Sequence, residues 1–146
     1  MTTKAIQLIA VFLFGTAALY AQDVPESQVP SAIVNNFKKD FPNASDVEWE
    51  RKGEQYKVEF ETGRDVDHDA WYSESGELAR HIEEIAVADI PDVVQNAIKN
   101  EFPGYRIDDA KRMVEKGVES YKVEVEKDKE ELDVVFSKEG KLLQSR

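Results

Sequence analysis

The chain contains one sequence unit twice, and this repeat constrains the fold more than any other feature. The first copy covers residues 29–78 and the second covers residues 90–142. In both copies a proline stands near the start, a Phe-Pro pair follows, and the letters YKVE come after it. The copies lie about 61 residues apart at their starts and 64 to 65 apart later, so the second copy carries a small insertion before Tyr121. Such a repeat predicts two structurally equivalent halves.

Each copy begins with the periodicity of a helix and continues with that of strands. Apolar side chains recur every three or four positions over residues 30–41 and over 91–102, which is the spacing of one helix face. Pro42 and Pro103 end these stretches, because proline disfavours helical backbone in the residue before it. Alternation of apolar and polar residues then predicts four strands in each copy: 47–51, 56–61, 66–72 and 78–85, then 107–114, 121–126, 132–136 and 141–145.

These units predict an α+β fold made of a helix and a four-stranded antiparallel meander, repeated in tandem. A unit of about 60 residues buries little apolar surface alone, so we expect residues 22–86 and 87–146 to fuse into one domain with one hydrophobic core. The expected product is one eight-stranded antiparallel sheet with both helices on one face. The other face would be wet and charged: Lys57, Glu59, Glu61, Asp67, Asp69, Lys122, Glu124, Glu126 and Asp133.

Residues Met1–Ala21 have the composition of a secretory signal peptide. A single basic residue precedes an uncharged apolar run over residues 5–19, and small residues follow it. We expect cleavage after Ala21, with cleavage after Ala18 as the alternative. The run is shorter than the roughly 20 residues of a membrane-spanning helix, and no second run follows. The sequence therefore predicts a periplasmic or secreted protein without stable membrane insertion.

The chain is strongly acidic and has no cysteine. It has 30 acidic and 19 basic side chains, a formal net charge of −11 at pH 7. This charge favours solubility and repels nucleic acid and anionic membranes, so we expect neither as a partner. The lack of cysteine excludes disulfides and a lipid-modified cysteine, although an exported protein could use them. No glycine-rich phosphate loop occurs, and we expect no cofactor.

The repeated proline, amphipathic helix, Phe-Pro pair and YKVE strand resemble the PepSY-like family of exported bacterial proteins, over nearly all of the chain after residue 21. The resemblance implies the fold of β-lactamase-inhibitor protein, a tandem repeat of a helix and a four-stranded sheet, and a periplasmic or secreted address. That inhibitor binds its enzyme with a concave sheet and a loop-borne aspartate, and it contains disulfides. Here there is no cysteine and no matching loop, which argues against inhibition of a β-lactamase itself.

The sequence offers little for catalysis, and we expect no enzymatic activity. There is no cysteine nucleophile and no Gly-x-Ser-x-Gly motif, and no pairing of a nucleophile with a base is visible. The two histidines are His68 and His81. His68 takes the place of Leu132 in the repeat, so we interpret it as a partly buried structural residue. His81 stands among charged neighbours, and we interpret it as a surface residue.

Asp65, Asp67 and Asp69 suggest a calcium loop at first sight. An EF-hand loop counted from Asp65 would need glycine at its sixth position and glutamate at its twelfth, where this chain has Ala70 and Gly76. We therefore predict no dedicated metal site and interpret the three aspartates as one outward row on a strand. They are weak candidates for a loosely held cation, because any cation relieves crowded carboxylates.

The two tryptophans are the best candidates for partner binding. Trp71 has the strand parity of Asp67 and Asp69, and Trp49 aligns with Arg112 in the second copy. We therefore predict that both lie on the wet sheet face with the strand of Lys57, Glu59 and Glu61 between them; coverage by sheet curvature or a terminal segment is the alternative. Exposed aromatic residues with charges around them are typical of partner surfaces.

Together these patterns predict a non-enzymatic binding module of the cell envelope or the extracellular space. It would bind a protein or a peptide through its exposed sheet face, in an inhibitor-like or envelope-interaction role. The alternative is a small-ligand or divalent-cation binding protein that uses the acidic residues of the same face.

Overall fold

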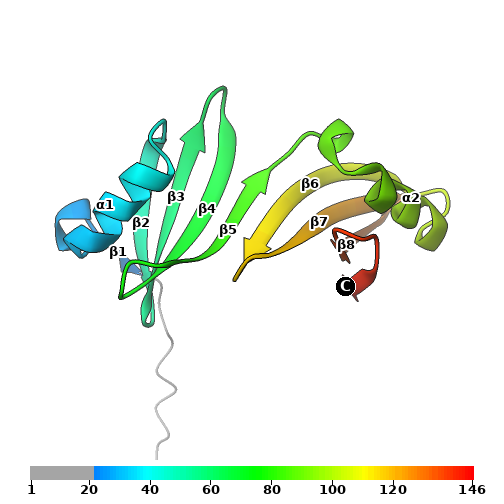
Figure 1. Ribbon diagram of the computed structural model, residues 1–146. Helices are drawn as coiled ribbons and strands as arrows, with labels where there is room; N and C mark the ends of the chain where they lie inside the picture. Colours follow the sequence, from blue (N-terminus) through cyan, green and yellow to red (C-terminus); the bar gives the residue numbers. More distant parts are fainter. Residues whose placement is uncertain (1–21) are drawn as a thin grey trace, which may run out of the picture.

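The computed structural model describes residues 22–146 and shows two helix-plus-sheet repeats joined in one sheet (Figure 1). The predicted signal peptide lies outside these residues. The first repeat contains helix α1 (Ser31–Asp40) and strands β2 (Ser45–Lys52), β3 (Gln55–Thr62), β4 (Val66–Ser73) and β5 (Leu78–Glu84). The second contains α2 (Asp92–Glu101), β6 (Arg106–Glu115), β7 (Val118–Lys127), β8 (Glu130–Ser137) and β9 (Leu142–Ser145). Short 3-10 turns at Glu26–Gln28 and Val87–Asp89 precede the helices.

The sheet is antiparallel throughout, and its strands are neighbours in the order in which they follow one another in the chain. Eight of the nine strands are those predicted from the alternation of apolar residues. The ninth is β1 (Gln22–Asp23), which pairs with Arg51 and Glu50 of β2. Its two residues are polar and carry no alternation, so the sequence does not indicate a strand there. β1 supplies partners to the outer edge of β2, which is otherwise unpaired.

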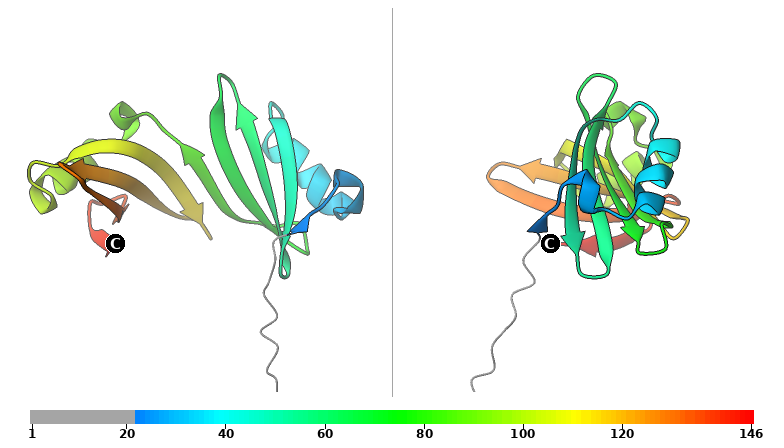
Figure 2. Two further views of the ribbon diagram at one scale, coloured as in Figure 1. Left: turned by 180° about the vertical axis from the view of Figure 1, so that it is seen from behind. Right: turned by 90° about the vertical axis from the view of Figure 1, so that its left-hand side faces the viewer.

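Both helices cover the same face of the sheet, as predicted (Figures 1 and 2). Residues directly opposite each other on antiparallel strands point to the same face. One such row crosses six strands of the sheet and connects the two hydrophobic layers: Phe60, His68, Glu83, Arg112, Tyr121 and Phe136. Phe60 packs under α1 with Phe37, whereas Tyr121 and Phe136 belong to the layer of α2. The middle of this row carries charged and imidazole side chains.

The prediction of one hydrophobic core is wrong, because each repeat has its own. Buried side chains of α1 pack on β2, β3 and β4, and those of α2 pack on β6, β7 and β8. No buried residue of one cluster is shared with the other among residues 22–146. The sequence shows how many residues are apolar. It does not show that the two helices lie too far apart on the sheet to pack against the same buried side chains. The polar middle of the row separates the two cores.

The insertion before Tyr121 builds the joint between the repeats. Strands β6 and β7 have 10 residues each, whereas their equivalents β2 and β3 have 8. The extra length lies at the turn end of the β6–β7 hairpin. There β6 pairs with β5 over residues Lys111–Glu115, opposite Arg80–Glu84. The longer hairpin therefore supplies much of the edge on which the second repeat joins the first.

Candidate functional site

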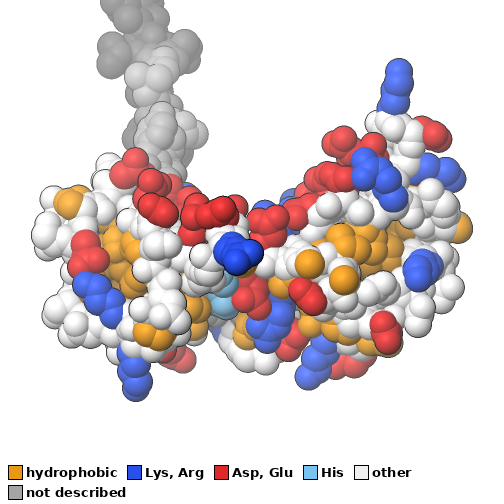
Figure 3. Space-filling model, turned by 90° about the horizontal axis from the view of Figure 1, so that it is seen from above, with side chains coloured by type: hydrophobic (Ala, Val, Ile, Leu, Met, Phe, Trp, Pro, Cys, Tyr) orange, Lys and Arg blue, Asp and Glu red, His pale blue; other side chains and the backbone are white. Residues whose placement is uncertain are grey.

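The face of the sheet without helices is hollowed and acidic. A groove of about 400 Å³ lies on it, over strands β2 to β6. In Figure 3 red acidic side chains gather along the indented edge of the molecule. The lining contains two lysines, Lys57 and Lys111, and seven carboxylates: Asp46, Glu48, Glu59, Glu61, Asp67, Asp69 and Glu84. Strand alternation produces this crowding, because outward residues of neighbouring strands stand opposite one another, as Glu59 does to Asp69 and Glu61 to Asp67.

Lys57 neutralises only part of this charge. Its ammonium group is bonded to Glu59 and lies 2.9 Å from an oxygen of Asp69. Burial alone would lower the pKa of Lys57, but its bonds to these two carboxylates outweigh burial and raise that pKa. At Glu61 partial desolvation, followed by repulsion from neighbouring aspartates, raises the pKa of the carboxyl group. The groove therefore has an excess of negative charge that its lysines do not neutralise.

Trp71 lies beside this groove on the same face, as its strand parity predicts. It stands opposite Lys57 on one side and Arg80 on the other. The guanidinium carbon of Arg80 is 4.9 Å from the centre of a Trp71 ring, and the ammonium nitrogen of Lys57 is 5.5 Å from it. Trp71 is half-buried by these neighbours. Cations over its faces hold the ring in place at the edge of the acidic groove.

The predicted placement of Trp49 on the wet face is wrong. Its side chain is 4% exposed and packs edge-on against Phe37 of α1, with ring centres 5.2 Å apart. Trp49 stands opposite Val58, and Ala110 stands opposite Val123. Because these two valines are equivalent in the YKVE motifs, the repeat partner of Trp49 is Ala110 and not Arg112. The insertion follows the position of Trp49 rather than preceding it, which shifts the alignment by two residues.

The structure separates the three aspartates that were weak metal candidates. Asp67 and Asp69 lie on the outward face of β4, but Asp65 lies in the turn before it with a positive φ of 55°. In residues 22–146, one group of three or more His, Asp or Glu side chains has ligand atoms all within 4.8 Å of one another, and it is another set: His68, His81 and Glu83. This cluster lies on the helix side of the sheet, at the level of the joint.

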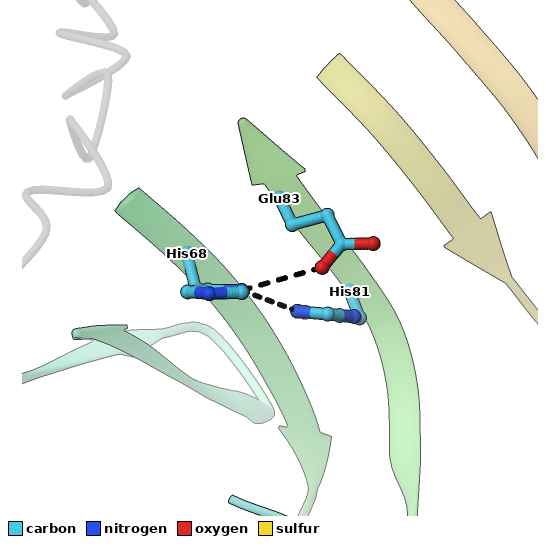
Figure 4. A group of neighbouring side chains, drawn as sticks. All are labelled: His68, His81 and Glu83. Carbon is cyan, nitrogen blue, oxygen red and sulfur yellow. Dashed lines mark hydrogen bonds and ion pairs between the residues drawn. The ribbon is translucent and has the colours of Figure 1, made fainter. Parts of the chain in front are cut away.

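The cluster is built from two adjacent strands (Figure 4). His68 of β4 stands directly opposite Glu83 of β5, and His81 lies two residues before Glu83 on the same face. His68 Nδ1 is 3.0 Å from His81 Nε2 and 3.9 Å from Glu83 Oε2. The other nitrogen of His68, Nε2, is 2.7 Å from the hydroxyl of Thr62. Four groups on three strands therefore converge at one point.

Arg112 connects this cluster to the second repeat. Its Nη1 donates to Glu83 Oε1 at 3.0 Å, and its Nε donates to Glu119 Oε1, also at 3.0 Å. The hydrogen bonds to Glu119 and then to Glu83 raise the pKa of Arg112, against the effect of burial. Bonds from Arg112 and Tyr121 lower the pKa of the Glu119 carboxyl group. The charge of Arg112 is thus shared between one carboxylate of each repeat.

The interpretation of His68 as a partly buried residue is confirmed, because its side chain is 8% exposed. The interpretation of His81 as a surface residue is wrong: it is half-buried, with its ring centre 4.9 Å from that of Phe41. Burial lowers the pKa of both imidazoles, and the carboxylate of Glu83 opposes this without reversing it. Both rings are therefore predominantly neutral at pH 7. The charged sequence neighbours of His81 conceal this, because alternate residues of a strand face opposite sides.

Solved structures show the same fold. A BLIP-like protein from Bacteroides fragilis is 24% identical, with a TM-score of 0.68 over 84% of this chain and 86% of that one. A "putative periplasmic" protein from Bacteroides eggerthii is 18% identical, with a TM-score of 0.71 over 81% and 88% of the two chains. A DUF2874 family protein from Bacteroides ovatus is 19% identical, with a TM-score of 0.70 over 86% and 89%.

Comparison with curated proteins found no match. Within the described residues, no helix is long and apolar enough to cross a membrane. The family model described as "Putative beta-lactamase-inhibitor-like, PepSY-like" matches twice, over residues 18–80 and 66–144. The two matches correspond to the two repeats and together cover nearly the whole described chain. The protein therefore belongs to the PepSY-like family and has the fold of the BLIP-like proteins.

Proposed function

We propose that this protein is a non-enzymatic, exported binding module that holds a basic segment of another protein in its acidic groove. The observation that carries the proposal is the composition of the groove, with seven carboxylates against two lysines on the hollowed face of the sheet. One of those lysines, Lys57, is already paired with Glu59 and Asp69. A partner that brings lysine or arginine side chains would relieve this repulsion, and charge complementarity of this kind speeds association and selects the partner.

Trp71 and the residues around it supply an aromatic contact surface in addition to the charge of the groove. Interface hot spots are enriched in tryptophan, tyrosine and arginine, and Trp71 stands between Arg80 and Lys57 at the edge of the groove. We assign Trp71 as the anchor, Glu59 and Glu61 as the carboxylates that receive the partner's cations, and Lys57 as the group that orients Glu59. Trp49 has no part in this surface because it is a core residue.

The polar lining favours a protein segment over a small organic ligand. Small-molecule pockets are lined mostly by apolar side chains with a few polar groups. Here seven of the twelve lining residues are acidic. The proposal of an exported protein rests on the predicted signal peptide and on the likeness to the B. eggerthii protein. Family membership and fold support a binding role like that of an inhibitor.

The test is capture of proteins from a cell-envelope extract by the purified protein, quantified by mass spectrometry at low and at raised salt. Glu59→Lys reverses a charge inside the groove, whereas Glu54→Lys makes the same change in net charge on the exposed turn between β2 and β3. We expect Glu54→Lys to retain the captured protein and Glu59→Lys to lose it, most strongly at low salt, where long-range attraction is least screened. Equal loss in both variants would mean that net charge, and not the groove, causes the capture.

A further inference from the structure

We propose that His68, His81 and Glu83 bind a divalent transition-metal ion of the zinc class at the joint between the repeats, on the face opposite the acidic groove. The ligand atoms are His68 Nδ1, His81 Nε2 and Glu83 Oε2. Two imidazoles and one carboxylate form a ligand set used for zinc and related ions. Three protein ligands leave one position of a tetrahedral ion open for water or for an atom of a partner.

The distances are close to those of a bound site. Two nitrogens at about 2.0–2.1 Å from a tetrahedral zinc lie about 3.3 Å apart. Here His68 Nδ1 and His81 Nε2 are 3.0 Å apart, and Glu83 Oε2 is 3.9 Å from His68 Nδ1. An ion would take the place of the hydrogen bond between the two nitrogens, and shifts of less than about 1 Å would place the three ligand atoms around it. Their positions on paired strands restrict larger movements.

Two of the three ligands, His68 and Glu83, are already oriented by a second group. Metal-binding histidines usually donate their other N–H group to an oxygen, and His68 Nε2 lies 2.7 Å from the Thr62 hydroxyl. A proton on Nε2, donated to this hydroxyl, leaves the lone pair of Nδ1 to accept from His81 or to bind an ion. Glu83 Oε1 accepts a hydrogen bond from Arg112, and Glu83 Oε2 faces His68. Because Glu119 also binds Arg112, one guanidinium charge is shared by two carboxylates, and the three residues together keep one net negative charge beside the proposed site.

The repeat shows that packing does not require these histidines. His68 stands opposite Phe60, and Leu132 stands opposite the equivalent Val125, so Leu132 takes the place of His68 in the second repeat. In the same way His81 stands opposite Ala70 and Ser145 opposite Val134, so Ser145 takes the place of His81. The second repeat has the same fold without either imidazole. Burial keeps both histidines neutral, which is the form that binds metal. In Figure 3 pale-blue histidine atoms are visible at the surface between the two lobes, and His81 is only half-buried.

The experiment is a titration of the full chain, freed of metal by a chelator, with Zn²⁺ alone, followed by calorimetry and by the imidazole signals in long-range ¹H–¹⁵N NMR spectra. We expect one Zn²⁺ per chain and shifts of the signals of both histidines. Mg²⁺ should produce neither, because it prefers oxygen ligands. Affinity should fall as pH decreases, since protons compete with the ion for the imidazoles.

The variants use residues that the fold already accepts. His68→Leu and His81→Ser introduce the residues of the second repeat, and we expect each to weaken Zn²⁺ binding at least tenfold. Thr62→Val should weaken it about tenfold through the orientation of His68. Asp133→Asn, on the charged face of β8 in the second repeat, is the control and should leave the affinity unchanged. Absence of Zn²⁺ binding to the unaltered chain, unshifted imidazole signals, or equal losses in Asp133→Asn and His81→Ser would overturn the proposal.

Discussion

The two repeats build equivalent cores from different side chains. The first core is rich in aromatic residues and the second in aliphatic ones. Where the first repeat has Phe37, Trp49 and Phe60, the second has Ile98, Ala110 and Val125. All six are buried, so the same backbone arrangement tolerates both ways of filling its interior. A difference between the repeats at a packing position therefore needs no functional explanation, whereas a difference at a polar position does.

What the repeats share is mostly backbone geometry. Gly76 and Gly140 follow β4 and β8 at φ angles of 87° and 84°, where other residues are strained. A Cβ atom on Gly140 would lie 2.9 Å from the carbonyl oxygen of Val93 in α2, and one on Gly76 would lie 2.9 Å from Nδ2 of the Asn36 side chain in α1. In both repeats this turn lies against the helix. Both glycines fit the positive φ of this turn, and at Gly140 the backbone of the helix also leaves no room for a side chain.

The largest effect should come from truncating equivalent helix residues in the two cores. Phe37→Ala should cost about 3–5 kcal/mol of unfolding free energy and Ile98→Ala about 2–5 kcal/mol, because both side chains are almost fully buried. Since pairing of β5 with β6 makes one sheet of the two repeats, we expect each variant to melt in a single transition. Denaturant unfolding, followed by amide exchange in each repeat, measures both quantities.

Separate behaviour of the repeats would contradict the prediction of one fused domain. In that case Phe37→Ala would remove exchange protection from α1 and β2–β4 while β6–β8 kept theirs. Ile98→Ala would give the opposite pattern, so the two variants control for each other.

A smaller effect should distinguish two equivalent arginines. Arg51 stands opposite Tyr56 as Arg112 stands opposite Tyr121, but Arg51 makes an exposed contact of 3.3 Å with Glu74. Arg51→Ala should change stability by less than about 1 kcal/mol, as for surface ion pairs. Arg112→Ala should cost about 1–3 kcal/mol, because it leaves the half-buried Glu83 and Glu119 without their donor. Thermal melting of both variants in low salt makes the comparison, and equal losses would show that Arg112 does not stabilise the joint.

The sequence predicts the repeating elements well because apolar periodicity is a local property. The helices, eight strands and the shared helix face follow from it, and the insertion before Tyr121 follows from the changed spacing between the two copies. The errors concern arrangements that local periodicity does not encode. Trp49 is misplaced because the exact position of the insertion depends on strand pairing, and the one-core prediction fails because helix separation is a property of the whole sheet. The cluster of His68, His81 and Glu83 is missed because His68 is paired with a residue fifteen positions later.

The smallest expected effect on stability is at Trp71, where it should be accompanied by the clearest effect on binding. Trp71 stands opposite Lys57, and Val135 stands opposite the equivalent Lys122, so Val135 takes the place of Trp71 in the second repeat. Trp71→Val therefore introduces a residue that the fold accepts. The variant loses two cation–π contacts on a solvent-facing surface, and its unfolding free energy should fall by no more than about 1 kcal/mol. If Trp71 anchors the partner, capture should weaken by about 2 kcal/mol or more, which is roughly thirtyfold.

The matched control is Phe60→Val, which also introduces the residue of the second repeat but empties space beneath α1. Phe60 is 3% exposed and lies against Phe37 and Phe41, so this variant should lose about 2 kcal/mol or more of stability and keep the affinity of its folded fraction. Should Trp71→Val destabilise the protein as much as Phe60→Val and leave capture unchanged, Trp71 would be a packing residue, and the binding role would then rest on the acidic groove alone.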